Sequence, residues 1–144
     1  MAQALIEANK ASSRGEVPIG AVIVERKSGK IIARAHNLVE TRPDPCAHAE
    51  VLAIQEACKT LGDARLPQCD LYVTLEPCSM CATAISFARI HSLYFGAYDP
   101  KGGGVDHGAC IFSHPTCHHK PEVYGGIQEI ECGNILKDFF KARR

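Results

Sequence analysis

Two short motifs bring metal-binding side chains together with a carboxylate. They are Cys46-Ala47-His48-Ala49-Glu50 and Glu76-Pro77-Cys78-Ser79-Met80-Cys81. An imidazole from His48 and thiolates from Cys78 and Cys81 form the N/S ligand set that Zn²⁺ prefers. Three protein ligands leave the fourth tetrahedral position to water, which is typical of a catalytic site. Zinc lowers the pKa of such a water to about 7, and Glu50 is placed to take its proton and pass it to a leaving group.

Both motifs are expected at helix N-termini. Asp44-Pro45 precedes an Ala-rich run and predicts an N-cap followed by proline in the first turn of a helix from about 47 to 61. The second motif follows an expected strand at 71–75 and opens a helix expected at 79–89. Cys78 and Cys81 would then share one face of the first turn, where the positive end of the helix dipole favours thiolates.

Three other interpretations of these motifs stay open at this point. Cys46 could supply a fourth ligand and close a purely structural zinc site. Cys78 and Cys81 could instead form a redox pair of the Cys-x-x-Cys kind, although such pairs need no distant His-x-Glu. Finally, His48 could be a satisfied core histidine and the cysteines small hydrophobic residues.

Bulk properties indicate one globular domain, residues 1–144. Sixteen basic and sixteen acidic residues give zero formal charge, so a nucleic acid would have to be held by a local patch. The chain has eight cysteines, but its N-terminus lacks a secretory layout and no apolar run is long enough to span a membrane. We therefore expect a cytoplasmic protein whose cysteines stay reduced, without a membrane partner.

The remaining periodicity completes the fold prediction. Helices are expected at 2–13 and 128–141, and further strands at 17–24, 30–35, 91–96 and 122–125. The turn at 28–29 makes the first two strands an antiparallel hairpin, and the later alternation of strand and helix implies parallel pairing. The predicted fold is α/β, a three-layer α/β/α sandwich around a mixed five-stranded sheet.

Two regions outside the motifs have the composition of binding elements. Residues 98–121 lack a regular hydrophobic pattern, and a loop region of that length is often functional. Within this region, Cys117-His118-His119 is not favoured as a second metal site because adjacent histidines point apart. The tail from Lys137 to Arg144 places four basic residues beside two aromatic residues. Taken alone these charges suit a solvated helix end, and together with Lys101 and Lys120 they could equally form a phosphate-binding rim.

His-x-Glu followed by Pro-Cys-x-x-Cys is the known signature of zinc nucleobase deaminases. The resemblance extends along nearly the whole chain and is closest to the bacterial tRNA-specific adenosine deaminases of the cytidine/deoxycytidylate deaminase superfamily. The zinc motifs are shared across that superfamily, whereas the sequence from residue 98 onward argues for the tRNA enzymes. The segments that carry the resemblance are Glu16-Val17-Pro18-Ile19-Gly20-Ala21-Val22, His36-Asn37, Ala47-His48-Ala49-Glu50, Leu71-Tyr72-Val73-Thr74-Leu75-Glu76-Pro77-Cys78, Asp99-Pro100-Lys101-Gly102-Gly103 and Asp138-Phe139-Phe140-Lys141.

The resemblance implies a site and a reaction. It implies one Zn²⁺ per subunit held by His48, Cys78 and Cys81, with Glu50 as the catalytic proton shuttle. It also implies a homodimer that converts adenosine to inosine at the wobble position of a tRNA anticodon stem-loop, with zinc hydroxide attacking C6. The substrate-binding residues that it implies are Asn37, the Ala49 backbone and Ile19 around the nucleoside, and Asp99, His114, Lys141 and Arg143 at the flanking nucleotides.

Two alternatives compete with this function. The protein could be a zinc deaminase of a free base or nucleoside such as cytosine, cytidine or guanine, which would need no basic rim. It could also be a non-catalytic RNA-binding module stapled by zinc. Replacement of Glu50 distinguishes an enzyme from the non-catalytic module, because only an enzyme would lose turnover while its metal content is kept.

Overall fold

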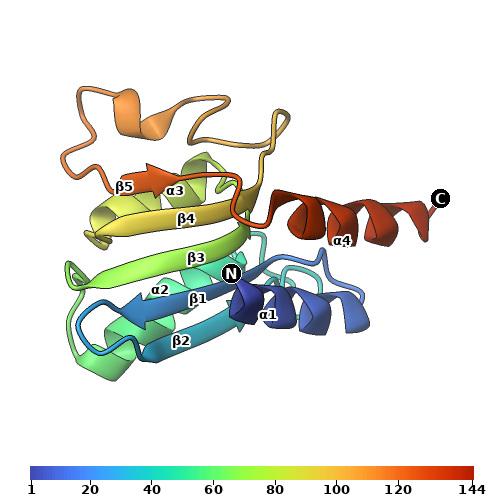
Figure 1. Cartoon of the computed structure of the whole chain (residues 1–144), viewed down its shortest axis with the longest axis horizontal. Helices are drawn as coiled ribbons and strands as arrows, with labels where there is room; N and C mark the ends of the chain where they lie inside the picture. The colour runs from blue at the N-terminus through green and yellow to red at the C-terminus, as the bar shows by residue number, and fades with distance from the viewer.

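Four α-helices and five strands make up the regular structure (Figure 1). The computed structural model describes residues 1–144. In chain order the elements are α1 (Ala2–Ser13), β1 (Gly20–Glu25), β2 (Ile31–His36), α2 (Ala49–Leu61), β3 (Cys69–Leu75), α3 (Ser79–Phe87), β4 (Ser92–Ala97), the single 3-10 turn η1 (Ile111–Ser113), β5 (Glu122–Tyr124) and α4 (Glu129–Lys141). No helix combines the length and the apolar composition that crossing a membrane requires.

The strands form one mixed sheet in the order β2-β1-β3-β4-β5. Strand β1 pairs antiparallel with both of its neighbours, whereas β3, β4 and β5 run parallel. Helices α1 and α4 lie on one face of the sheet, with α2 and α3 behind it (Figure 1). The predicted three-layer sandwich with a mixed five-stranded sheet is confirmed.

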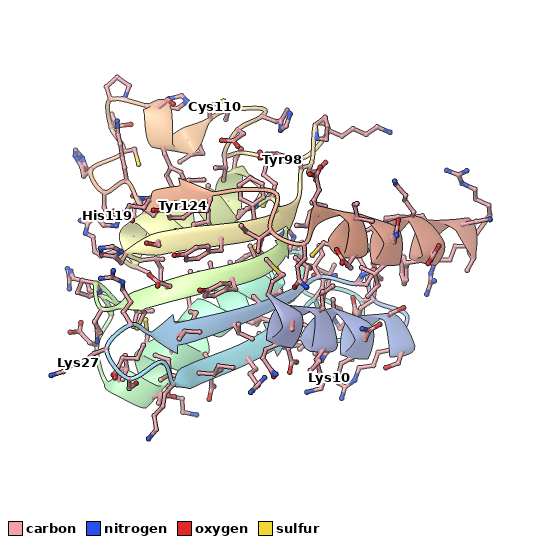
Figure 2. The ribbon with its side chains drawn as sticks, viewed as in Figure 1. Lys10, Lys27, Tyr98, Cys110, His119 and Tyr124 are labelled. Atoms are coloured by element: carbon pink, nitrogen blue, oxygen red, sulfur yellow. The ribbon has the colours of Figure 1, made fainter.

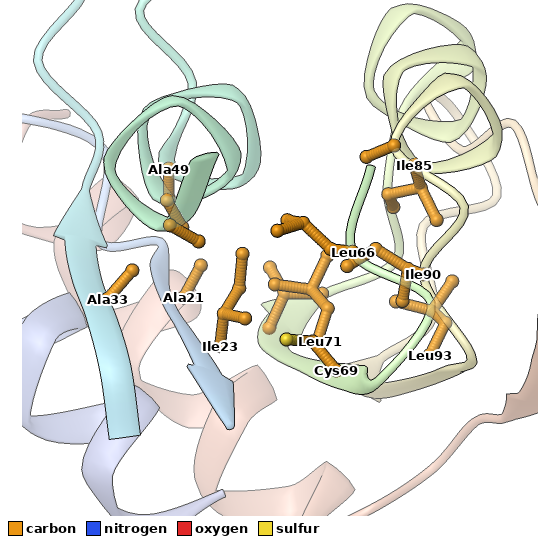
Figure 3. Close-up of a cluster of buried hydrophobic side chains, with 14 of the residues drawn as sticks. Ala21, Ile23, Ala33, Ala49, Leu66, Cys69, Leu71, Ile85, Ile90 and Leu93 are labelled. Atoms are coloured by element: carbon orange, nitrogen blue, oxygen red, sulfur yellow. The ribbon is translucent and has the colours of Figure 1, made fainter. Parts of the chain in front are cut away.

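The main core fills the space between the sheet and helices α2 and α3 (Figure 3). Helix α2 buries Ala49, Ala53 and Ala57, which are four residues apart and therefore share one face. Opposite them lie fully buried residues of β1, among them Ala21 and Ile23. Small side chains on this face let α2 approach the sheet closely, which fixes the position of its N-terminus.

Two glycines let the front helices pack directly on the strands. A Cβ at Gly20 would overlap the carbonyl oxygen of Ala4 in α1, and a Cβ at Gly96 would overlap the sulfur of Cys132 in α4. These helices cover only part of their face. Beyond them Tyr72, Tyr94 and Tyr124 form a stacked row, with ring centroids 4.5 and 5.0 Å apart, and Tyr124 is visible on β5 in Figure 2.

Strand β1 begins later than the predicted residue 17. The amide N–H of Ile19 donates to the carbonyl oxygen of Val17 (2.8 Å), so residues 17–19 form a tight turn before the ladder starts at Gly20. The carbonyl oxygen of Ile19 then accepts the amide N–H of Asn37 (3.0 Å). Local hydrogen bonding around Pro18 therefore ends the strand early and leaves Ile19 beside the end of β2.

Candidate active site

The antiparallel placement of β1 gathers the motifs at one edge of the sheet. Gly20, the first residue of β1, pairs with His36, the last residue of β2. Its amide N–H also donates to the Thr74 hydroxyl oxygen near the end of β3 (3.2 Å). The segments that lead from β2 into α2 and from β3 into α3 consequently leave the sheet side by side.

Three metal-binding side chains meet where these two helices begin. The Nδ1 atom of His48 lies 3.6 Å from the sulfur of Cys78 and 3.5 Å from the sulfur of Cys81. All three donor atoms fall within 4.8 Å of one another. Tetrahedral zinc with Zn–N near 2.05 Å and Zn–S near 2.3 Å would separate nitrogen and sulfur by about 3.6 Å. The cluster thus has the donor types and the spacing of a zinc site.

Both helices place a ligand at their N-cap. His48, with φ −77° and ψ 148°, caps α2, and Cys78 caps α3. The prediction that Asp44 caps the first of these helices is wrong. The Asp44 side chain instead accepts the amide N–H of Cys46 (2.8 Å), and its carbonyl oxygen accepts that of Ala47 (3.1 Å), so a turn precedes the helix.

Cys46 takes no part in the cluster. Its side chain is exposed, and the group of converging donors contains only His48, Cys78 and Cys81. The structure therefore favours the three-ligand arrangement over the closed four-ligand site that Cys46 would have completed.

Hydrogen bonds within the cluster prepare it for a cation. The Cys81 thiol and then the His48 ring lower the pKa of Cys78 to about 4, so this sulfur is a thiolate at neutral pH. The same contact with Cys78 raises the pKa of His48 and that of Cys81. Binding of a metal ion to these three groups would release the protons that they carry, because metal ligands must be deprotonated.

Glu50 lies in the first turn of α2, immediately beyond Ala49. Its side chain is buried, and desolvation raises the pKa of the carboxyl group to about 7. A carboxyl group with that pKa can both accept and release a proton near neutral pH, as general acid–base catalysis requires. Ala49 itself is fully buried between the two functional residues.

A cavity of about 450 Å³ opens beside the cluster. Ile19, Asn37 and His48 line one part of it, and Phe139 and Arg143 from the end of α4 line another. Three of the predicted substrate-binding residues, Ile19, Asn37 and Arg143, therefore meet at His48 although they are far apart in the sequence. The guanidinium of Arg143 lies 3.5 Å from the centroid of the Phe139 ring, an arrangement that holds it flat.

This arrangement accompanies full-length similarity to known deaminases. The MafB19-like deaminase family profile matches residues 1–144. A tRNA-specific adenosine deaminase of Agrobacterium fabrum (strain C58) is 56% identical over 144 residues, covering 100% of this chain and 93% of that protein. The chain belongs to the tRNA-specific adenosine deaminases.

Solved structures of the family and of related enzymes share the fold. One, from work on A-to-I editing by tRNA:A34 deaminases at the wobble position of transfer RNA, matches with a TM-score of 0.91 and 57% identity over 94% of this chain and 97% of that chain. A guanine deaminase from Nitrosomonas europaea matches with a TM-score of 0.83 and 22% identity, covering 96% of this chain and 81% of that chain. Enzymes acting on different substrates therefore share this architecture, and the fold alone does not select among them.

Lys141 lies in a second hollow, which we call the basic groove. Its lining contains five basic residues, and the apolar residues Leu136 and Phe140 complete it. The basic residues are Lys101, Lys137, Lys141, Arg143 and Arg144. The expected association of Lys101 with the basic tail is thus seen in the structure, whereas Lys120 lies outside the groove. Arg143 lines both the groove and the cavity at His48.

Two predicted contact residues lie apart from the cavity at His48. The Asp99 carboxylate accepts the backbone N–H groups of Lys101 (3.2 Å) and Gly102 (2.9 Å). His114 is exposed, and its Nε2 atom lies 2.7 Å from the carbonyl oxygen of Ala109. It lines a separate cavity near Phe87 at the end of α3. Neither residue contacts the metal cluster.

The sequence reasoning assigned no role to Glu16, although it shapes the site. This fully buried carboxylate accepts the side-chain N–H of Asn37 (3.3 Å) and the backbone N–H groups of Glu40 (3.2 Å) and Thr41 (2.6 Å). Burial alone would raise its pKa, but these donors outweigh burial and lower it. The hydrogen bond from the Asn37 amide nitrogen to Glu16 fixes the orientation of the Asn37 side chain. A glutamate directly before the apolar run of residues 17–24 was the available signal.

Proposed function

We propose that the protein hydrolytically deaminates adenosine to inosine at the wobble position of a tRNA anticodon. The observation that carries this proposal is the convergence of His48, Cys78 and Cys81 beside buried Glu50, in a chain 56% identical to a tRNA-specific adenosine deaminase along its whole length. A three-ligand cluster with an adjacent acid–base is suited to activating water rather than to a structural role.

His48, Cys78 and Cys81 would hold one Zn²⁺ per subunit. Bound there, zinc would act as a Lewis acid toward a water molecule and lower its pKa to near neutrality, so that this water could attack the reacting carbon. Glu50 would take one proton from the water and deliver it to N1 of the purine. It would then take the second proton from the hydroxyl group at C6, as the C6 carbonyl forms and the C6–N bond breaks, and give it to the amine, which leaves as ammonia. Burial raises the pKa of Glu50 in the metal-free protein, which supports a carboxyl group that can take up a proton and give it away again.

The cavity at His48 would receive the extruded adenosine. Asn37 is buried at its wall with its amide nitrogen already bonded to Glu16, which leaves its carbonyl oxygen to accept a hydrogen bond from the nucleoside. Ile19 would pack against the base, and the Ala49 backbone, which lies between His48 and Glu50, would contact its edge. Bases of an anticodon loop are largely unpaired, so extrusion costs less than from a duplex.

The basic groove would bind the backbone beside the flipped nucleotide. Lys141 and Arg143 carry charge at the end of α4, and Arg143 also borders the cavity, so it would contact the substrate next to the reacting base. Asp99 shapes the turn that carries Lys101. His114 would contact RNA only if the strand extends to the separate cavity over α3.

We further propose that the active form is a homodimer in the cytoplasm, where its tRNA substrate is found. Helix α3 leaves Phe87 73% exposed and Met80 36% exposed, a combination that supports a contact with another copy of the chain. Light scattering after gel filtration tests this, since Phe87→Lys would convert a dimer to a monomer. A wild-type monomer at micromolar concentration would contradict it.

The deciding experiment measures inosine and ammonia from an anticodon stem-loop with adenosine at the wobble position. Free adenosine, cytidine, cytosine and guanine are run beside it, with Glu50→Gln as the matched inactive control. Inosine from the stem-loop alone, abolished by the substitution, supports the proposal. Turnover of a free base or nucleoside would keep the mechanism and overturn the substrate, and a zinc-loaded protein silent on all substrates would instead be a non-catalytic module.

A further inference from the structure

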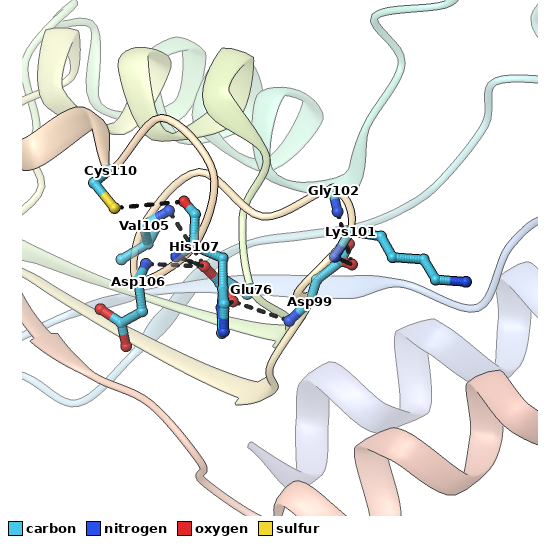
Figure 4. A network of polar contacts seen from close by, with 8 residues as sticks. All are labelled: Glu76, Asp99, Lys101, Gly102, Val105, Asp106, His107 and Cys110. Carbon is cyan, nitrogen blue, oxygen red and sulfur yellow. Dashed lines mark hydrogen bonds and ion pairs between the residues drawn. The ribbon is translucent and has the colours of Figure 1, made fainter.

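Glu76 lies at the junction of β3 and α3, and the mechanism gives it no role. Its carboxylate is fully buried and accepts five hydrogen bonds from a single loop (Figure 4). One oxygen accepts the backbone N–H of Asp99 (2.9 Å) and lies 2.8 Å from Nδ1 of His107. The other accepts the backbone N–H groups of Val105 (3.3 Å), Asp106 (2.9 Å) and His107 (3.0 Å).

These bonds draw the two ends of the loop to one point. Asp99 lies at its start and residues 105–107 at its end, so Glu76 closes the loop as a clasp. Each bond has an ionised acceptor in a buried place, which makes it stronger than a bond between neutral groups. A side chain with this many fixed donors holds backbone rather than substrate.

Glycines bring the middle of the loop against the metal-binding segment. A Cβ at Gly103 would lie 2.5 Å from a Glu76 carboxylate oxygen, and a Cβ at Gly104 would lie 2.5 Å from the backbone nitrogen of Ser79. The N–H of Gly104 donates to the carbonyl oxygen of Pro77 (2.8 Å). The loop therefore rests on the residues on either side of Cys78, and its shape is tied to that segment.

The clasped loop presents Lys101 to the basic groove. Lys101 follows Asp99 in the turn, and it lines the groove together with Lys137 and Lys141 from α4. It is the only basic residue of the groove that does not come from the α4 region. Its position relative to the helix thus depends on how the loop is held.

We propose that Glu76 is a positioning residue for RNA binding: by clasping residues 99–107 it sets Lys101 opposite the basic end of α4. This inference rests on the proposed function, because it takes the groove to be the path of the tRNA backbone. It assigns to Glu76 an effect on affinity for the stem-loop, exerted through Lys101, and no effect on the chemical step.

The test measures the Kd of the zinc-loaded protein for an anticodon stem-loop by fluorescence anisotropy over a series of salt concentrations. Glu76→Gln keeps the size of the side chain but puts an N–H₂ group where an oxygen accepts N–H groups. It should weaken binding about tenfold, roughly the consequence of misplacing one charged contact, while zinc content and kcat stay within about twofold. Lys101→Ala should weaken binding similarly and reduce the salt slope by about 1.

The double variant decides whether Glu76 acts through Lys101. In the Lys101→Ala background, Glu76→Gln should change Kd by less than about twofold, because coupled residues are not additive. A full tenfold effect in that background, or loss of zinc from Glu76→Gln, would overturn the proposal. His107→Ala, which removes one side-chain bond, gives a milder variant with the same expected direction should Glu76→Gln fail to fold.

Glu16→Gln is the matched control, since it alters a second buried carboxylate that holds a different loop. Hydrogen exchange should be faster at Asp99, Asp106 and His107 in Glu76→Gln and faster at Glu40 and Thr41 in Glu16→Gln. Binding is measured on a stem-loop that already carries inosine at the wobble position, and turnover is assayed separately on the adenosine stem-loop. Wild-type protein that binds but forms no inosine would therefore reject the proposed function alone. Unchanged exchange at residues 99–107 in Glu76→Gln would reject the clasp itself.

Discussion

Buried glutamates of this protein are of two kinds. Glu16 and Glu76 anchor loops through backbone N–H donors, and in both cases these donors outweigh burial and lower the pKa of the carboxyl group. Glu50 is equally removed from solvent, yet its pKa is raised to about 7. Burial disfavours the charged form in all three cases. Hydrogen-bond donors outweigh it at Glu16 and Glu76, whereas at Glu50 desolvation dominates and the negative charge of Cys78 adds to it.

The direction of the pKa shift distinguishes a carboxylate that holds a loop in position from one that can transfer protons. A carboxylate surrounded by donors stays ionised and can only accept hydrogen bonds, which suits an anchor. A carboxyl group left with few donors changes protonation near neutral pH, which suits a proton shuttle. Under the proposed function, glutamate serves both tasks, and the surroundings of each side chain distinguish them.

Loss of the shuttle should have the largest effect. Glu50→Gln keeps volume and removes the titrating group, so kcat for the stem-loop should fall by about 10³ to 10⁴, the upper part of the range for general acid–base catalysis. Single-turnover assays measure the loss, and metal analysis should find zinc unchanged. If the variant keeps more than a tenth of wild-type kcat, Glu50 belongs with the anchors.

The opposite pKa shifts should give opposite pH dependences of stability in metal-free protein. The ordinary pKa of 4.5 for Glu50 rises to about 7 on folding, so wild-type protein loses stability as pH rises through that interval. Glu50→Gln should therefore gain on the order of 2–3 kcal/mol relative to wild type between pH 4 and pH 8. Denaturant unfolding across pH, in the presence of chelator, measures the difference.

Glu16→Gln provides the contrast. Its lowered pKa gives stability that is present above 4.5 and is lost as pH falls, so this substitution should cost most at neutral pH and little in acid. Parallel pH profiles for the two variants would contradict the distinction between anchor and shuttle.

The loop of residues 99–107 can also be displaced while its anchor Glu76 is left unchanged. Gly104→Ala would push the loop away from the start of α3, because the new Cβ would lie 2.5 Å from the Ser79 nitrogen. We expect about 1–3 kcal/mol of destabilisation, measured by denaturant unfolding. Gly133→Ala is the control: nothing lies within 4 Å of the added methyl group within α4, so about 0.5–1 kcal/mol of stabilisation is expected. Equal effects would show that close approach of the loop is unimportant.

The smallest effect is expected at Arg143, which lines both the basic groove and the cavity at His48. Arg143→Lys keeps the charge but loses the flat contact with Phe139, worth about 0.5–1 kcal/mol, so KM for the stem-loop should rise about two- to fivefold. The salt slope should stay the same in Arg143→Lys and decrease in Arg143→Ala. Lys27→Ala removes a charge at the far end of the sheet, visible in Figure 2, and should change neither. A kcat effect in Arg143→Lys would place this residue in the chemistry.

The metal cluster could be predicted because its residue types and spacings form two recognisable motifs, although His48 and Cys78 are 30 positions apart. Cys78 and Cys81 are three residues apart, and a helix start brings such residues together whatever the rest of the chain does. Hydrophobic periodicity likewise predicted the strands, the helices and the layered fold. The exact helix start could not be predicted, because Asp44 was drawn into a turn by bonds that compete with capping.

The anchors and the cavity depended on long-range contacts. Glu16 meets Asn37 and Thr41 across 21 and 25 positions of sequence, and Glu76 meets His107 across 31. No local sequence pattern predicts such a contact. A single glutamate beside a strand looks the same in the sequence whether its side chain is exposed to solvent or hydrogen-bonded to a distant loop. The amino-acid sequence was sufficient to predict the group of His48, Cys78 and Cys81 and the order of the elements. The three-dimensional fold was needed to identify the carboxylates whose pKa is lowered and the residues that line the cavity at His48, because both depend on groups brought together by sheet pairing.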